Sequence, residues 1–127
     1  MTKLAAVLAI AVVDAGAEER RQTQSRIVVS IPDRKLLLFA GDRLVKIYDV
    51  AVGKSSTPTP EGEFRIINHV SNPTYYGSGM VVAPGKNNPL GTRWMGLSAK
   101  GYGIHGTNVP SSIGKAASHG CIRMRQQ

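Results

Sequence analysis

The feature that most constrains the fold is a succession of short aliphatic runs separated by turn residues. Residues 27–31 form a β-branched run that a Pro-Asp pair ends, and residues 35–39 form a second apolar run. A Gly-Asp pair then separates the second run from a third, residues 44–52. Short apolar runs joined by such pairs are typical of strands connected by tight turns. The sequence therefore predicts an antiparallel meander of three strands, and because the third run does not alternate cleanly, both its faces are expected to be covered.

The rest of the chain has the same short-range character. With Gly 14 and Pro 7 in 127 residues and no long amphipathic repeat, the composition favours β structure over a helical bundle. Further strands are expected at residues 62–68, 93–97 and 102–105. Turn-rich, irregular segments are expected at residues 72–79 and 84–91, and a loop at 106–117 with one helical turn near 112–116. The predicted class is mainly β, as a sandwich or a distorted barrel.

The N-terminal residues have the order of a secretory signal. Lys3 gives a basic start, residues 4–13 are apolar but too short to span a bilayer, and Ala15-Gly16-Ala17 fits a cleavage site. We expect a signal peptide at residues 1–17, a flexible lead at 18–25 and export to the periplasm or cell wall, with no membrane span. The alternative for the apolar run is a buried helix.

The charge pattern restricts the possible partners only loosely. The formal net charge is +8, but the basic residues are scattered and do not interleave with aromatic ones. No nucleic-acid-binding motif is present, so a nucleic-acid partner is not expected. The excess charge either keeps the protein soluble or attracts it to an anionic polymer or membrane surface.

The one cysteine, Cys121, lies in a setting that suits a thiol nucleophile. Such a thiol needs a base, backbone N–H groups that stabilise an oxyanion, and a group that orients the base. His105 and His119 are the histidines near it in sequence, and Gly120 lets the chain bend sharply and expose its own N–H and that of Cys121. The carbonyl of Gly106 is placed to hold the His105 ring. Arg123 either favours the thiolate or binds a substrate carboxylate.

Two other interpretations of this cysteine are open from the residues alone. One is an inert, buried thiol, since cysteine is also a small hydrophobic side chain. The other is a zinc site formed by His105, His119 and Cys121, but these residues lack the paired spacings of structural zinc sites and no carboxylate is close. We therefore expect no metal. His69, on another predicted strand, is expected to be a surface or packing residue.

Four ordered blocks resemble the YkuD-type L,D-transpeptidase catalytic domain: IVVSIPDRKLLLF, STPTPEGEFRI, NPLGTRWMGL and YGIHGTNVPSSIGKAASHGCIRM. The resemblance runs from Arg26 to Met124 and implies a β-sandwich catalytic domain at residues 26–127. It implies that Cys121 is the nucleophile and that His105 donates and accepts the proton. The remaining residues of the signature and pocket are Ser118, His119, Gly120, Gly106 and Arg123. Family domains continue past this signature through a helix and a strand, so the resemblance also implies that the C-terminal end of the domain is missing.

The resemblance also implies the substrate. The thiolate attacks the carbonyl of the third residue of a peptidoglycan stem peptide and expels the terminal D-alanine, and an amine of a neighbouring stem takes the thioester. Carbapenem-type β-lactams are the implied inhibitors, and no cofactor is required. Two alternatives remain open: an L,D-carboxypeptidase that uses water as acceptor, and a catalytically silent peptidoglycan-binding module.

Overall fold

The computed structural model describes residues 5–6 and 24–126 of the chain. The predicted signal peptide therefore lies outside the described residues apart from Ala5–Ala6, and the predicted lead lies outside them apart from residues 24–25. Within the described part, no helix is long and apolar enough to cross a membrane.

The first half of the fold is the predicted meander. Its strands are β2 (Ser25–Ser30), β3 (Lys35–Ala40) and β4 (Arg43–Gly53), and each pairs antiparallel with the next. The two-residue strand β1 (Ala5–Ala6) pairs antiparallel with the free edge of β2. The prediction of three consecutive antiparallel strands is confirmed.

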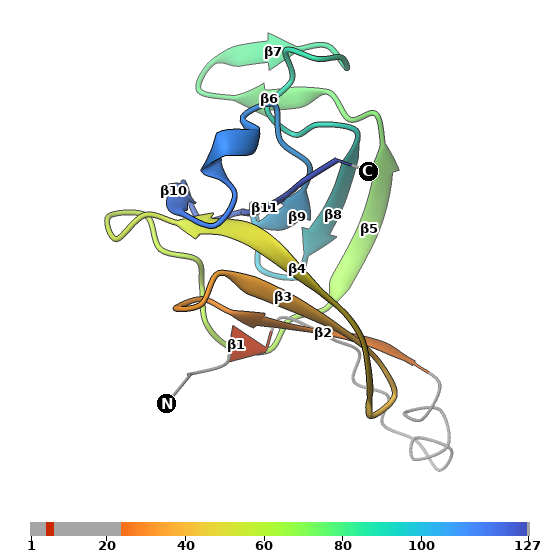
Figure 1. Cartoon of the computed structure of the whole chain (residues 1–127). Helices are drawn as coiled ribbons and strands as arrows, with labels where there is room; N and C mark the ends of the chain where they lie inside the picture. The colour runs from red at the N-terminus through yellow and green to blue at the C-terminus, as the bar shows by residue number, and fades with distance from the viewer. Residues whose placement is uncertain (1–4, 7–23, 127) are drawn as a thin grey trace.

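Strand β4 joins the two halves of the molecule (Figure 1). The side chains of Leu44, Val45 and Ile47 are exposed, whereas Val50 and Val52 are buried. The expectation that both faces of this run are covered is therefore wrong for its first half. Strands β10 and β11, which come from residues far along the chain, pair only with the C-terminal end of β4. The N-terminal end of β4 therefore has no such neighbour.

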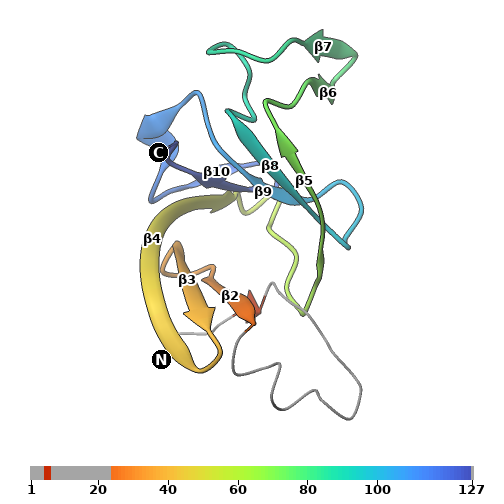
Figure 2. The same ribbon diagram turned by 90° about the vertical axis from the view of Figure 1, so that its right-hand side faces the viewer.

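The second half continues the same sheet beyond β4, in the order β11, β9, β8, β5. Its strands are β5 (Ile66–Ser71), β8 (Arg93–Leu97), β9 (Gly103–His105) and β11 (Ile122–Met124). The short strand β10 (Ala116–Ser118) pairs parallel with the end of β4. The sheet bends at β4, as the rotated view shows (Figure 2), so side chains of both halves pack into one core. That core includes Val29, Leu36, Val50, Ile104 and Ile122. The predicted β-sandwich is confirmed.

Several predicted boundaries are wrong. The strand expected at 62–68 begins only at Ile66, and the helical turn expected near 112–116 is the 3₁₀ turn η1 (Pro110–Ser112). Proline suits the first helical position because its fixed φ is helical and its missing N–H has no partner there anyway. The segment expected to be irregular at 72–79 contains most of a hairpin, β6 (Tyr75–Gly77) and β7 (Met80–Val82). Ser78 and Gly79, both with positive φ, form its tight turn.

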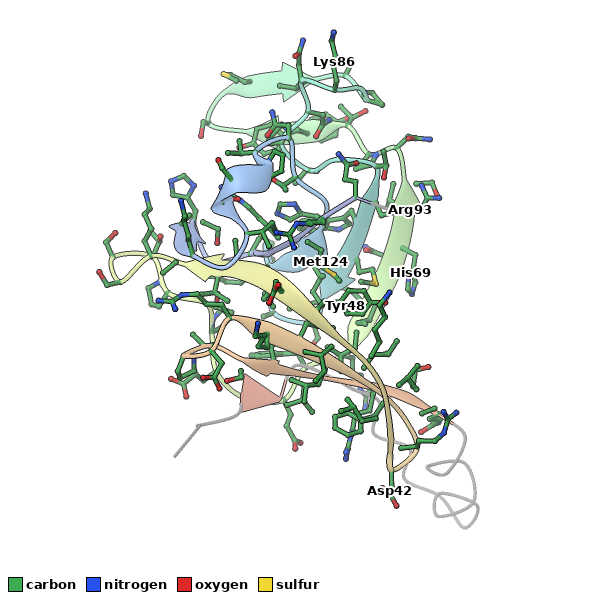
Figure 3. All side chains as sticks on the ribbon, in the orientation of Figure 1. Asp42, Tyr48, His69, Lys86, Arg93 and Met124 are labelled. Carbon is green, nitrogen blue, oxygen red and sulfur yellow. The ribbon has the colours of Figure 1, made fainter. Side chains whose placement is uncertain are left out.

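A hollow of 520 Å³ remains between the two halves. Its lining includes the apolar side chains of Leu38, Tyr48, Met95 and Met124, and His69 also lines it. Figure 3 shows Tyr48 and Met124 between β4 and β8, far from the tip of the β3–β4 hairpin at Asp42. His69 is exposed on β5, in agreement with the surface role expected for it.

Candidate active site

Two parallel strands bring the thiol and the imidazole together. In the register of β9 and β11, Ile122 pairs with Ile104 and Arg123 pairs with His105. Cys121 directly precedes β11, so the register places it beside Gly103, two residues before His105. The thiol donates a weak hydrogen bond to the carbonyl of Gly101, with Sγ and O 3.8 Å apart. The sheet thus places Cys121 and His105, which the chain separates by a loop, on neighbouring strands two register positions apart.

His105 is held in one orientation from two sides. Its side chain is 7% exposed, and its ring stacks on Trp94, its register partner on β8, with centroids 5.7 Å apart and planes at 20°. Nδ1 lies 2.5 Å from the carbonyl oxygen of Gly106. Because a carbonyl only accepts hydrogen bonds, Nδ1 is the protonated nitrogen, and Nε2 of the neutral ring carries the lone pair. This is the orienting role that the sequence predicts for Gly106.

The buried environment keeps this imidazole neutral. Burial lowers the pKa of His105 to about 4, the hydrogen bond to Gly106 acts in the opposite direction, and the positive charge of Arg123 lowers the pKa further. At neutral pH Nε2 is therefore an available proton acceptor.

The thiol is also neutral in the resting site. Cys121 is half-buried and is a free cysteine. Burial raises the pKa of the Cys121 thiol, while the backbone of Gly103 and the charge of Arg123 lower it by smaller amounts. At neutral pH the thiol and the imidazole are therefore both uncharged rather than a thiolate–imidazolium pair.

Arg123 and His119 occupy different positions relative to this pair. Arg123 is half-buried on β11, and its charge influences the pKa of both Cys121 and His105. The His119 side chain is exposed in the bend before Cys121. The segment from His119 to Cys121 is not extended, because Gly120 has a φ of +120° and the chain turns there.

The turn from Ser118 to Cys121 is fixed by its own side chain. Ser118 is 1% exposed, and its Oγ accepts from the N–H of Gly120 at 3.1 Å and donates to the carbonyl of Cys121 at 2.5 Å. A Cβ on Gly120 would lie 2.5 Å from Cε1 of Tyr102, so only glycine fits in this conformation. Ser118 and Gly120 therefore shape the turn that carries the thiol.

Two threonines of the block STPTPEGEFRI also contact this turn. Thr57 donates from Oγ1 to the carbonyl of Ser118 at 3.0 Å, and Thr59 donates from Oγ1 to the carbonyl of Gly120 at 2.8 Å. The signal for them was present in the Thr-Pro-Thr-Pro stretch, where each proline holds the residue before it extended. Without the tertiary structure, nothing in that stretch indicated which backbone the hydroxyls meet.

The described residues contain no group of three or more His, Cys, Asp or Glu side chains that could hold a metal ion. Within the described residues, His105, His119 and Cys121 therefore do not form the cluster that a zinc site would need.

The site thus combines a free thiol before β11 with an oriented, neutral imidazole on the neighbouring strand β9. The family model for the L,D-transpeptidase catalytic domain matches residues 24–127. The chain belongs to the L,D-transpeptidase catalytic domain family.

Curated relatives agree with this assignment. The chain is 51% identical over 102 residues to the L,D-transpeptidase YkuD of Bacillus licheniformis, covering 80% of this chain and 54% of the relative. It is 48% identical over 101 residues to YkuD of Bacillus subtilis, with the same coverage of 80% and 54%. The chain thus spans about half the length of the curated relatives it matches.

Solved structures have the same fold. The catalytic domain of the E. faecium L,D-transpeptidase acylated by ertapenem superposes with a TM-score of 0.62 at 26% identity, over 80% of this chain and 81% of that one. The Ldtfm–avibactam carbamoyl enzyme superposes with a TM-score of 0.60 at 27% identity, over 73% and 37%.

Proposed function

We propose that this domain is an exported peptidoglycan L,D-transpeptidase that cross-links the third residues of stem peptides through a thioester on Cys121. One observation carries the proposal. The hydrogen bond from Nδ1 of His105 to the Gly106 carbonyl leaves Nε2 as the proton acceptor in the strand next to the thiol.

Acylation requires a proton to leave the thiol as it attacks. Nε2 of His105 takes the proton from Sγ of Cys121 while the sulfur adds to the carbonyl carbon of the third stem residue. The N–H of Cys121 donates to the oxyanion. The imidazolium then gives its proton to the amine of the terminal D-alanine, which leaves, and the thioester remains.

Transfer repeats these steps with a new nucleophile. The side-chain amine of a neighbouring stem attacks the thioester, and His105 takes a proton from the amine and returns it to the departing sulfur. Amide exchange through a thioester needs no metal or organic cofactor. Arg123, beside both reacting groups, provides a positive charge that suits a stem-peptide carboxylate. The net charge of +8 favours approach to an anionic wall polymer.

If water instead of an amine attacks the thioester, the same acyl-enzyme acts as an L,D-carboxypeptidase. A catalytically silent binding module is the alternative from another class, and the oriented His105 argues against it because a module that only binds has no use for a neutral base beside a thiol. Export through residues 1–17, to the periplasm or cell wall, is part of the proposal.

The test is mass spectrometry of muropeptides incubated with the purified protein, with Cys121→Ala as control. We expect loss of D-alanine and formation of dimers joined through third residues. Monomers that lack D-alanine, without dimers, would indicate the carboxypeptidase, and binding to sacculi without any product would indicate the silent module.

A second readout examines the nucleophile itself. Ertapenem acylates the E. faecium domain, and we expect it to add its mass to Cys121 here. Intact-mass data with no adduct on the folded wild-type protein, while a control transpeptidase reacts, would contradict the assignment of Cys121.

A further inference from the structure

Thr59 is a buried hydroxyl that links two distant parts of the chain. Its side chain is 5% exposed, and it lies in the loop that follows β4. Its Oγ1 accepts a hydrogen bond from the N–H of Gly53, the last residue of β4, at 2.9 Å. The same oxygen donates to the carbonyl of Gly120 at 2.8 Å. The hydroxyl therefore ties the end of β4 to the residue before the thiol.

This contact determines the direction of the next N–H group. The peptide between Gly120 and Cys121 is planar and trans, so its C=O and N–H point in opposite directions. Because the Gly120 oxygen faces Thr59, the N–H of Cys121 points away from Thr59. The N–H of Gly120 already donates to Oγ of Ser118, so the Cys121 N–H is the better oxyanion donor of the two.

The loop that carries Thr59 packs directly against the end of β4. It lies so close to the end of β4 that a Cβ on Gly53 would be 2.2 Å from the Thr57 carbonyl oxygen and 2.6 Å from the Thr59 nitrogen. A hydroxyl is required at this position because it both donates and accepts. Valine has almost the shape of threonine but makes neither bond.

We propose that Thr59 is a positioning residue for acyl transfer: its hydroxyl fixes the Gly120–Cys121 peptide so that the Cys121 N–H donates to the oxyanion. This inference rests on the proposed function, because it assumes that Cys121 Sγ adds to a carbonyl. Thr59 touches neither the substrate nor the thiol and acts through the Gly120 carbonyl.

The experiment compares two reactions of the same thiol in folded protein. Acylation by ertapenem passes through an oxyanion, whereas alkylation by iodoacetamide displaces iodide from a saturated carbon and forms none. Thr59→Val should acylate about 10- to 100-fold more slowly, somewhat less than the ~10²–10³ lost when an oxyanion donor is deleted. Its alkylation rate should stay within about twofold of wild type, because the proposed effect depends on the oxyanion.

Two variants serve as controls. Thr59→Ser keeps the hydroxyl and should restore acylation. Thr57→Val removes the hydrogen bond that a hydroxyl of the same loop donates to the Ser118 carbonyl. That carbonyl still accepts a hydrogen bond from the N–H of Lys54 at 2.9 Å. It should acylate at nearly the wild-type rate. If Thr59→Val does not unfold cooperatively, Thr59→Ala replaces it in the comparison.

The outcomes separate this inference from the proposed function. Wild-type acylation rates in the folded Thr59 variant would overturn the inference, as would an equal loss of acylation and alkylation, which would mean that the thiol itself has moved. A wild-type protein that is alkylated but never acylated would overturn the proposed function and this inference with it. A loss confined to acylation, restored by serine and absent in Thr57→Val, supports the inference.

Discussion

The neutral state of His105 makes folding stability depend on pH in a defined window. In the unfolded chain the imidazole has a pKa near its ordinary 6.5, whereas burial lowers the pKa of His105 to about 4 in the folded protein. Between these two values the unfolded state binds a proton that the folded state does not. The free energy of unfolding is therefore at its full value above pH 6.5 and falls as the pH drops toward 4.

The size of this loss follows from the two pKa values. The interval from 6.5 to about 4, at about 1.36 kcal/mol for each pH unit, corresponds to about 3 kcal/mol. That is a large part of the roughly 5–15 kcal/mol that stabilises a typical domain. His105→Gln is the matched variant, because glutamine does not titrate and its amide is able to donate to the Gly106 carbonyl.

The assay is urea unfolding at pH 7 and pH 4.5, followed by tryptophan fluorescence. The chain has one tryptophan, Trp94, and it stacks on His105, so the probe lies at the group under test. The exposed histidines His69 and His119 are present in both proteins, and their effects cancel in the difference. We expect the wild type to lose more than 2 kcal/mol relative to the variant over this interval.

An equal loss in both proteins would refute the reasoning. If the glutamine variant does not fold, an NMR titration of the His105 ring in the wild type decides the question. A midpoint at or above 6 would show that burial does not keep this ring neutral.

Three further predictions concern the same site and the N-terminus. His105→Ala should lower the acylation rate by about 10²–10⁴-fold because the proton acceptor is lost, whereas His119→Ala should change it little; stopped-flow acylation measures both, and a larger loss at His119 would reverse the assignment. Gly120→Ala should lower the melting temperature more than Gly114→Ala, because both positions have positive φ but only at Gly120 does the new Cβ meet another side chain; equal shifts would contradict the packing argument. N-terminal sequencing of protein from a secreting host should find cleavage after Ala17, and an intact Met1 on a cytoplasmic product would be the contrary result.

The sequence by itself determined the class of fold and singled out the groups that we propose to be chemically active. Turn pairs between short aliphatic runs predict strands 27–31 and 35–39 because both strand preference and turn formation are local properties. The thiol, the imidazole and the flexible Gly120 were identified from residue type and neighbours. The resemblance supplied the family and the assignment of His105 as the base.

Only the tertiary structure decided how these groups meet. The order of strands in the second half of the sheet is set by packing between distant residues, so the parallel pairing that puts Arg123 beside His105 could not be derived from local pattern. Packing between distant residues also decides that Leu44 on β4 is exposed and that the Thr59 hydroxyl contacts Gly120. The pKa of His105 is lowered because folding removes the ring from water, and burial is a property of the assembled core that no short stretch of sequence contains.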